Sequence, residues 1–505
     1  MIFYLIVFAI AYYLWWFIDK RRKLPPGPMP LPIIGNVHQL GLEMEPMEQQ
    51  INKWGKQYRG IYTIWMPQPR VIITDYELLR EALVQNAEAL AGRPHQYVFE
   101  VFNGGMWGIA LTEGAIWKEH RRFAVHVLRD FGFGRNIMED KINFEIDRLL
   151  EYFKRKMDSK SQIQIQIENP ITAMITSVVS DVTIGCRFEL EGDKELNNML
   201  DINRRALNNL NEPATLMLDL FPWLRYIPFF NHFNYDKVSQ SSTEFFDLFR
   251  RLMKEHKEWV ENHPDEEPED YFAAYLQVVR KRKENGEDVG TFSDAQLLGS
   301  VLDLWTAGME TTITTLLWLF RVLTVYPEIQ TRAREEIHKV LGVDRRCTMT
   351  DRQYLPYTMA CLHEVQRWAN IIPLNVLHRT TKDIVVGGVE IPNDTTVLPQ
   401  ISSVHWDPKY FNNPMEFNPG RFLTREGEID THKLEIVTPF GLGKRQCLGE
   451  SLARMNMFMI FTTILQKFKL ELTAEDRART PAEMFKPEFR FTRCTRAFEV
   501  VMVNV

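Results

Sequence analysis

The feature that most constrains this chain is a glycine-rich turn that contains a cysteine, FGLGKRQCLG at residues 440–449. Glycine permits a tight turn with exposed backbone N–H groups, and the sequence predicts a helix directly after it, over residues 451–465. Such N–H groups and a helix N-terminus both stabilise a thiolate. Gly449 leaves space for a flat group against the helix, and Arg445 adds a positive charge two residues before Cys447. A thiolate ligand to haem iron, with a propionate paired to the arginine, meets all of these conditions.

This turn resembles the haem-ligand signature of the cytochrome P450 family, F-x-x-G-x-R-x-C-x-G, whose fixed positions are here Phe440, Gly443, Arg445, Cys447 and Gly449. Further motifs precede it in the family's order: Trp117-x-x-x-Arg121, Ala307-Gly308-x-Glu310-Thr311, Glu364-x-x-Arg367 and Pro419-x-Arg421-Phe422. The proline-rich segment near the N-terminus and residues 270–276 and 377–383 are similar to the animal microsomal branch, which oxidises drugs, fatty acids and steroids. The resemblance therefore extends from that proline-rich segment to near the end of the chain.

The resemblance implies haem b, iron protoporphyrin IX, as the cofactor and Cys447 as the axial ligand of its iron. Four side chains are implied to bond the two propionates, which need donors once they are buried: Trp117, Arg121, His378 and Arg445. Taken alone, each of the four could also be a surface or packing residue. The family usually has proline before the histidine, where this chain has Leu377. The other cofactor-binding positions lie in the turn itself: Phe440, Gly443 and Gly449.

A pair of opposite charges follows Pro356, which is expected to open a helix. Glu364 and Arg367 stand three residues apart, a spacing that on a surface helix gives an ion pair of about 0.2–0.5 kcal/mol. The resemblance implies instead a structural network beneath the haem, in which Glu364 shares its carboxylate with Arg421. This network is expected to have no catalytic role.

One predicted helix is exceptionally long. Ser293 and Gln296 suggest a capping box, and the apolar run continues to Tyr326, so about 32 residues would span roughly 48 Å. A membrane span is the rival interpretation, but Asp303 and Glu310 fall inside the run, and each charge at mid-bilayer costs at least ~2.5 kcal/mol. We therefore expect a buried helix that crosses the whole domain.

The centre of this helix carries the candidate catalytic residues. Gly308 costs about 1 kcal/mol against alanine inside a helix, so it needs a packing or functional reason. In the family, the helix opens here to admit dioxygen beside the iron. Glu310 and Thr311 resemble the acid–alcohol pair that relays protons to bound oxygen, although Thr311 could simply bond back to its own helix. Met309 replaces the family's common threonine.

The substrate walls are less distinct in the sequence. Position in the family implicates five mostly apolar residues: Phe102, Trp305, Ala307, Ile372 and Leu374. They indicate a small hydrophobic substrate without identifying it. Residues 220–230 are aromatic and contain two prolines, which is consistent equally with a second contact to a bilayer and with core packing.

The N-terminus predicts a membrane anchor. Residues 2–18 carry no charge and would span roughly 25 Å as a helix, close to the thickness of an endoplasmic-reticulum bilayer. A cleaved signal peptide would have basic residues before the apolar run, whereas here they follow it, at residues 20–23. The positive-inside rule then predicts a single-pass protein of the endoplasmic reticulum whose catalytic domain is cytosolic. We divide the chain into an anchor (1–19), a basic and proline-rich hinge that acts as a stiff spacer (20–35) and one haem domain (36–505).

Composition and patterning agree with a single globular domain behind the anchor. Sixty basic and 66 acidic residues leave a net charge of −6, which argues against a nucleic-acid partner. Five cysteines without a C-x-x-C pattern suggest a reducing compartment and no zinc site. Alternating or β-branched runs at 61–65 and 70–74 predict a hairpin, and similar runs at 384–386 and 397–398 predict further sheet. Two charged stretches, 264–270 and 280–288, predict loops. The fold class is mainly α with small β-sheets, the cytochrome P450 fold.

The resemblance implies a monooxygenase that inserts one atom of O2 into a hydrophobic xenobiotic, fatty acid or steroid. The chain has no nucleotide-binding motif, so NADPH would act only indirectly, through NADPH-cytochrome P450 reductase, with cytochrome b5 as a second candidate partner. Lys118, Arg122 and Lys444 could form a basic docking face, or could equally be solvated surface. Two rival functions stay open: a haem-thiolate isomerase or dehydratase that acts on a peroxide, and a haem-based sensor on the membrane.

Overall fold

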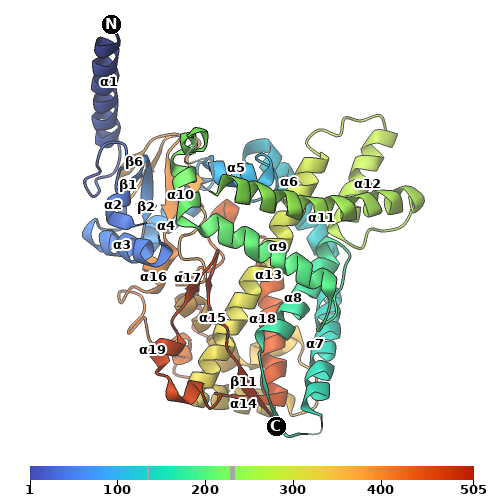
Figure 1. Cartoon of the computed structure of the whole chain (residues 1–505). Coiled ribbons are helices and arrows are strands. Elements are labelled where there is room, and N and C mark those ends of the chain that lie inside the picture. Colours follow the sequence, from blue (N-terminus) through green and yellow to red (C-terminus); the bar gives the residue numbers. More distant parts are fainter. Residues whose placement is uncertain (42, 133–135, 159, 228–233) are drawn as a thin grey trace.

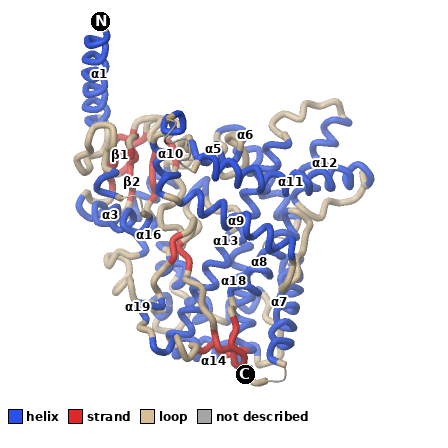
Figure 2. The backbone as a smooth tube through the Cα atoms, in the orientation of Figure 1, coloured by secondary structure: helices blue, strands red, loops and turns tan. Residues whose placement is uncertain are grey.

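The structure is a computed structural model that describes the whole chain except residues 42, 133–135, 159 and 228–233. Its α-helices are α1 Ile2–Arg22, α2 Val37–Leu40, α3 Met44–Gln57, α4 Tyr76–Arg80, α5 Tyr97–Asn103, α6 Gly114–Asp130, α7 Asn136–Met157, α8 Glu168–Thr183, α9 Lys194–Asn211, α10 Pro213–Leu220, α11 Tyr235–Asn262, α12 Tyr271–Glu284, α13 Asp294–Val325, α14 Pro327–Leu341, α15 Pro356–Ala369, α16 Ile401–His405, α17 Thr431–Ile436, α18 Glu450–Lys467 and α19 Pro481–Met484. The strands are β1 Ile61–Met66, β2 Gln68–Ile73, β3 Gln162–Ile165, β4 His378–Arg379, β5 Ile384–Val386, β6 Val389–Ile391, β7 Thr396–Pro399, β8 Phe468–Glu471, β9 Glu488–Phe489, β10 Arg493–Cys494 and β11 Val500–Asn504. The predicted class, mainly helical with small sheets, is confirmed (Figure 2).

The predicted early hairpin is confirmed: β1 and β2 pair antiparallel, with Ile61 opposite Ile73. Together with β7 and β4 they form a four-stranded sheet in the order β1-β2-β7-β4. The late strands also form, but they do not pair with each other. β5 pairs with β6, whereas β7 pairs in parallel with β2, more than 300 residues earlier in the chain. The alternation of apolar and polar residues predicts a strand, but it does not predict which distant strand will pair with it.

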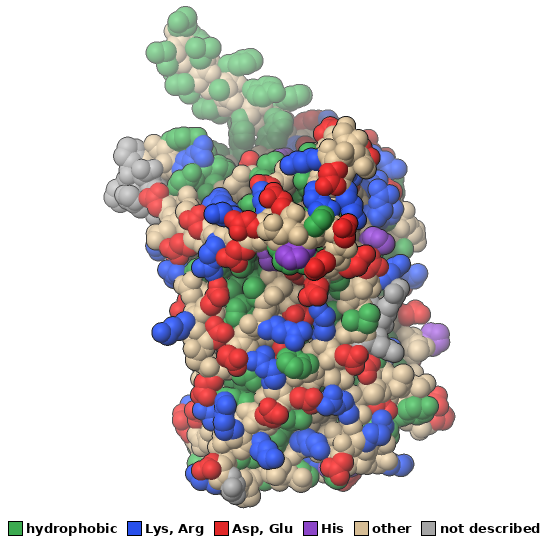
Figure 3. Space-filling model, turned by 90° about the vertical axis from the view of Figure 1, so that its right-hand side faces the viewer, with side chains coloured by type: hydrophobic (Ala, Val, Ile, Leu, Met, Phe, Trp, Pro, Cys, Tyr) green, Lys and Arg blue, Asp and Glu red, His purple; other side chains and the backbone are tan. Residues whose placement is uncertain are grey.

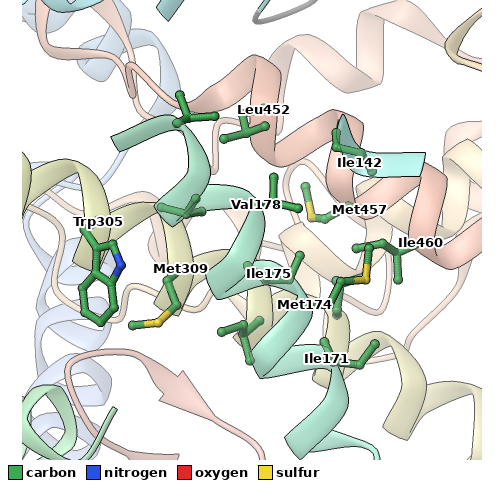
Figure 4. Close-up of a cluster of buried hydrophobic side chains, with 14 of the residues drawn as sticks. Ile142, Ile171, Met174, Ile175, Val178, Trp305, Met309, Leu452, Met457 and Ile460 are labelled. Atoms are coloured by element: carbon green, nitrogen blue, oxygen red, sulfur yellow. The ribbon is translucent and has the colours of Figure 1, made fainter. Parts of the chain in front are cut away.

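The long helix α13 crosses the middle of the domain (Figure 1), as predicted. Ser293 caps it by accepting a hydrogen bond from the Gln296 backbone N–H, at 3.2 Å. The second half of the predicted capping box is wrong, because the Gln296 side chain instead bonds both backbone groups of Gly108. Figure 4 shows how α13 packs against α8 and α18 through buried side chains that include Val178, Met309 and Leu452.

One predicted loop is partly helical. Residues 264–270 form a loop, but Arg280–Glu284 continue α12, and the chain leaves the helix only at Asn285. Asp270 is buried and caps α12 by accepting from the Ala273 N–H at 2.9 Å. The buried face of α12 ends at Gln277, and the charged residues that follow extend the helix beyond it to Glu284.

The first helix projects from the domain with most of its apolar side chains free (Figure 3). Within the described residues, α1 is the one helix long and apolar enough to cross a membrane. Its second half packs on the sheet: Phe17 is buried, its ring centroid lies 4.8 Å from that of Trp65, and the Trp16 ring lies 6.1 Å from Trp65. The following prolines are partly buried, and Gly27 lies so close to β1 that a Cβ would be 1.9 Å from the Thr63 carbonyl oxygen. The segment predicted as a spacer therefore packs on the domain.

Candidate active site

The cysteine turn closes on itself and on a distant segment. The Cys447 N–H donates to the Phe440 carbonyl at 2.8 Å, which makes residues 440–447 a compact loop. Gly443 has φ +73°, and a Cβ there would lie 1.8 Å from the carbonyl oxygen of Leu83, in the π-helical turn Glu81–Gln85. Both the conformation and this contact require glycine. Gly449 is the N-cap of α18, with its Cβ position 4.0 Å from the Cys447 sulfur.

Cys447 is accessible at a hollow of about 630 Å³, which Arg121, Arg352 and Arg454 also line. Burial by the surrounding chain raises the pKa of the Cys447 thiol, while the N–H groups of Gly449 and Glu450 and the charge of Arg121 oppose this effect. The turn thus directs N–H groups toward the sulfur, as expected, but burial outweighs them. Coordination to a cation would favour the thiolate.

Two arginines contact the ring of Trp117, and neither forms an ion pair with a described residue. The guanidinium of Arg445 lies 3.9 Å from the Trp117 ring centroid, and that of Arg121 lies 6.0 Å away. Arg93, which sequence reasoning missed, joins them electrostatically. Among the described residues, the guanidinium groups of these arginines donate only to backbone carbonyls, such as that of Ala91, and form no ion pair.

The electrostatics of this cluster indicate a missing anion. Burial, with the charges of Arg93 and Arg121, lowers the pKa of Arg445 to about 8. Burial and the charge of Arg121 likewise lower the pKa of Arg93 to about 10. The buried Nε1 of Trp117 has no hydrogen-bond partner in the described part of the chain. An anion that accepts several hydrogen bonds would satisfy all of these groups, and the two propionates of a haem fit this requirement.

His378 lies at the edge of the same cluster. Its Nδ1 is 2.7 Å from the Leu90 carbonyl, so Nδ1 carries the proton and donates. Burial, together with the charges of Arg93 and Arg445, lowers the pKa of His378 to about 3, so the ring is neutral and Nε2 is an acceptor. His378 would donate to a propionate only after that anion had raised its pKa. The predicted hydrogen bond from His378 to a propionate therefore depends on the negative charge of the cofactor.

One side of α13 remains accessible although the helix is interior. Asp303, Ala307 and Thr311, each four residues from the next, retain accessible surface, whereas residues 312–324 are buried. This spacing places the three residues on one face of the helix, which therefore borders a hollow. Gly308 lies beside this face and packs on α8, where a Cβ would be 3.3 Å from Val179. An accessible stripe in the centre of the fold offers a place for a flat cofactor and a substrate.

The two candidate proton-transfer residues point to different groups. The Thr311 hydroxyl donates to the Ala307 carbonyl at 2.7 Å, the back-bonded arrangement considered from the sequence. Glu310 accepts from the Thr492 hydroxyl at 3.1 Å, and burial raises the pKa of its carboxyl. The structure therefore holds Glu310 toward the β9–β10 region. A side-chain rotation would be needed to bring the two groups together.

The Glu364 network is compact, and its central pair, Glu364 and Arg367, is completely buried. Arg367 donates to both carboxylate oxygens of Glu364, at 2.7 and 2.8 Å, and Arg421 donates to one of them at 3.0 Å. The backbone N–H of Asn418 adds a fourth hydrogen bond, at 2.8 Å. Arg367 also donates to the carbonyl of His405, 38 residues further on. The ordinary surface pair is therefore excluded, and the network joins α15 to the segment that precedes the cysteine turn.

The predicted substrate residues occupy different surroundings. Ala307 is exposed on the accessible stripe of α13, and Ile372 and Leu374 are half-buried. Phe102 is buried, with its ring against Phe245. Trp305 is completely buried and donates to the Ser180 hydroxyl at 2.8 Å, on the opposite side from the stripe.

Other residues near the stripe were not predicted from the sequence. Asp303 accepts from the backbone N–H groups of Ile109 and Ala110, at 2.7 and 2.8 Å, and so fixes the loop that follows α5. In the sequence, Asp303 stands out as a carboxylate inside an apolar helix, but this pattern argues only against a membrane span and does not predict the contact with the loop. Arg93, between Gly92 and Pro94, gave no periodic signal.

The candidate docking cations are partly paired. Lys118 and Lys444 both contact the carboxylate of Glu88, the former at 3.0 Å, and Arg122 is exposed. The pKa of Glu88 falls to about 2 because both lysines bond it.

In the aromatic segment 220–230, Leu220, Phe221 and Leu224 are buried, whereas Trp223 and Tyr226 are exposed. Residues 228–230 lie outside the described part.

A mainly helical fold with a cysteine at a helix N-terminus, a cationic cluster and an interior accessible stripe defines a haem-thiolate protein. The family model for cytochrome P450 matches residues 25–492. The chain is 34% identical to the probable cytochrome P450 CYP36A1 of Caenorhabditis elegans over 92% of both chains. It is 34% identical to cytochrome P450 2C23 of Rattus norvegicus (92% and 90% covered) and 35% to cytochrome P450 2F2 of Mus musculus (91% of both). The chain belongs to the cytochrome P450 family and is a haem-thiolate monooxygenase that uses haem iron and O2.

Proposed function

We propose that this enzyme hydroxylates small apolar organic molecules with electrons delivered by an NADPH-dependent reductase. The overall balance is RH + O2 + 2e⁻ + 2H⁺ → ROH + H2O. When bound, haem b supplies the redox centre for oxygen, and a thiolate ligand donates electron density that favours O–O cleavage. The observation that carries the proposal is the accessible Cys447 sulfur beside three unpaired arginines.

The residues of this chain would then have separate tasks. Cys447 would hold the iron, and Trp117, Arg121, Arg445 and the neighbouring Arg93 would bind the propionates. The Trp117 N–H lacks a hydrogen-bond partner and the three guanidinium groups form no ion pair within the described chain. The buried walls exclude water, which strengthens each of these polar interactions. The shape of the accessible stripe on α13 orients the substrate.

Glu310 and Thr311 would supply protons beside the oxygen site. The raised pKa of Glu310 supports this role, because it keeps a proton on the carboxyl at a higher pH than an exposed glutamate would. The hydroxyl of Thr311 lies on the accessible face of α13 and can accept and donate a proton once it leaves the Ala307 carbonyl.

We further propose a single-pass endoplasmic-reticulum anchor, residues 1–19, with the hinge and haem domain in the cytosol. The apolar, largely exposed α1 and the basic residues in its last turn support this topology. A reductase would approach the hollow beside Cys447, where the exposed Arg352 supplies positive charge for an acidic flavoprotein. Cytochrome b5 could use the same surface.

Substitution of the ligand cysteine tests the proposal. We expect Cys447→Ala to abolish the carbon-monoxide band typical of ferrous thiolate haem, and with it NADPH-driven product formation in the presence of reductase. Cys186→Ala, at a half-buried cysteine outside the site, should leave both unchanged. An unaltered spectrum in Cys447→Ala would overturn the assignment. Product formation without NADPH would instead support the isomerase alternative.

A further inference from the structure

A second cavity, of about 730 Å³, is separate from the hollow at Cys447. It is bounded by α3, the end of α15, α16 and the chain before and within the β9–β10 pair. We call it the tryptophan cleft, because three tryptophans and a phenylalanine line it: Trp318, Trp368, Trp406 and Phe485. None of the described residues that line it also lines the hollow at Cys447. Its volume lies in the range of small-molecule sites, ~300–1,000 Å³.

The aromatic rings that form the wall of this cleft are fixed in place. The ring of Trp368 stands edge-on to that of Trp318, with centroids 5.5 Å apart, and to that of Phe485, with centroids 5.1 Å apart. All three indole N–H groups donate to backbone carbonyls, at 2.8–3.2 Å. The cleft is therefore preformed, and its walls favour a planar aromatic molecule, which loses little conformational entropy when it packs between rings.

Three exposed cations at the end of α3 also border the cleft: Lys53, Lys56 and Arg59. The two lysines are three residues apart, so they lie on one face of the helix, and Arg59 follows in the turn to β1. No side chain of the three forms a hydrogen bond or an ion pair with a described residue. An anionic group on a bound molecule would find these cations unoccupied.

The carboxylates around the cleft already have partners within the protein. Four of them line it: Glu45, Glu48, Asp75 and Asp407. Glu48 is buried and forms an ion pair with Arg493. The ammonium of Lys409 donates to Asp75 at 2.8 Å, and its backbone N–H donates to Asp407 at 2.9 Å. Glu45 accepts from an amide side chain one turn further along α3, at 3.3 Å. Unengaged charge at the cleft is therefore positive among the described residues, which favours an anionic ligand.

The wall of the cleft is connected to one of the proposed proton-transfer residues. The carbonyl of Arg493 accepts from the Trp318 indole at 2.8 Å. The preceding residue, Thr492, is completely buried and donates to Glu310 at 3.1 Å. This hydrogen bond must break before Glu310 can turn toward Thr311. A ligand that fixes Arg493 therefore also favours the conformation in which Glu310 points away from Thr311.

We propose that the tryptophan cleft is an effector site for a planar aromatic molecule with an anionic group, and that its occupation slows proton transfer by holding Glu310 to Thr492. The aromatic body packs against the indole rings, and the anionic group meets Lys53 and Lys56. The effect on proton transfer rests on the proposed monooxygenase function, whereas binding in the cleft does not. The ligand restrains Glu310 only to the extent that it binds the restrained conformation more tightly than the other.

Binding of a matched anion and neutral isostere tests the site. Full-length, haem-loaded protein in detergent is titrated by calorimetry with naphthalene-2-sulfonate and with naphthalene-2-sulfonamide, while the haem absorbance reports any binding at the iron. We expect the double variant Lys53→Gln, Lys56→Gln to weaken sulfonate binding about 3- to 30-fold and to leave the sulfonamide within about twofold. Lys382→Gln, at an exposed lysine outside the cleft, is the matched control and should change neither affinity.

Filling the cleft gives a second test of the same site. Gln49 is an exposed residue of α3 that lines the cleft, so a larger side chain can enter without disturbing the core. We expect Gln49→Trp to weaken both probes about tenfold or more, which corresponds to about 1.4 kcal/mol. Equal sulfonate affinity in the unsubstituted protein, the double lysine variant and Gln49→Trp would overturn the site.

Turnover tests the connection to Glu310. With reductase, NADPH and an apolar substrate, naphthalene-2-sulfonate should lower kcat about threefold or more and leave KM unchanged. Thr492→Ala should bind the sulfonate as the unsubstituted protein does but lose this inhibition, whereas Thr492→Ser keeps the hydroxyl and should retain it. Inhibition that persists in Thr492→Ala, or that appears as a raised KM, would overturn the connection. If the unsubstituted protein bound the sulfonate but formed no product with any substrate, the proposed monooxygenase function would fail and the binding site would stand.

Discussion

At the scale of single residues, Asp303 shows how one half-buried carboxyl can fix a loop. Burial raises the pKa of Asp303 to about 6, although the N–H groups of Ala110 and Ile109 and the charge of Arg93 oppose this shift. A carboxyl that holds its proton more tightly in the folded than in the unfolded state contributes stability at low pH. That contribution is complete below the unfolded value, near 3.8, and is lost as the pH rises through about 6.

Substitution of Asp303 should remove this pH dependence. Asn keeps an oxygen acceptor for the loop N–H groups but does not titrate. We expect the melting temperature of the unsubstituted protein to fall, relative to that of Asp303→Asn, between pH about 4 and about 6. Other titrating carboxyls, such as Glu48, are common to both proteins and cancel in the difference. If the melting temperatures of the two proteins changed with pH in the same way across this range, the titration of Asp303 would not be the cause.

At the scale of elements, the cysteine turn depends on a contact made elsewhere in the chain. Gly443 abuts the π-helical turn Glu81–Gln85, which follows the first sheet strands. The sequence correctly indicated a tight turn followed by a helix, since those are local properties. It could not indicate that Leu83 leaves no room for a Cβ, because that neighbour is 360 residues away in sequence.

Two glycine substitutions separate conformational strain from this contact. Gly443 and Gly427 both have positive φ, +73° and +87°, but a Cβ at Gly427 would meet nothing within 4 Å. Alanine should cost about 1–2 kcal/mol of strain at either position. We expect Gly427→Ala to retain haem, and Gly443→Ala to lose most of its thiolate band because the loop must move away from Leu83. The haem-to-protein ratio and the carbon-monoxide spectrum measure this; equal haem retention in the two variants would argue against the contact.

At the scale of the whole molecule, the anchor meets the domain through the second half of α1. Phe17 is the buried residue of α1, and both Phe17 and Trp16 pack against Trp65. The Tyr13 hydroxyl accepts a hydrogen bond from the Ile33 backbone N–H at 2.8 Å. The first part of the helix contributes membrane affinity, but little to the fold.

Two N-terminal deletions should separate membrane binding from stability. Removing residues 2–12 keeps Tyr13, Trp16 and Phe17, so the protein should leave the membrane fraction with an unchanged melting temperature. Removing residues 2–18 also loses these contacts, of which the buried Phe17 side chain alone corresponds to about 1.5–3 kcal/mol. Sedimentation with vesicles and thermal unfolding measure the two effects. Equal melting temperatures would mean that Phe17 does not stabilise the domain.

By itself, the sequence determined the features that depend on local pattern or on fixed spacing: the apolar first helix, the long central helix with its Ser293 cap, the β1–β2 hairpin and the Cys447 turn. Those features follow from periodicity, capping and turn chemistry, which act over a few residues. Only the tertiary structure brought Arg93 near Arg121 and Arg445, directed the Gln296 side chain to Gly108 and paired β7 with β2. These outcomes depend on burial and on contacts between segments that are distant in the sequence. The role of a charged side chain depends on the groups around it in space, and the sequence alone does not give those groups.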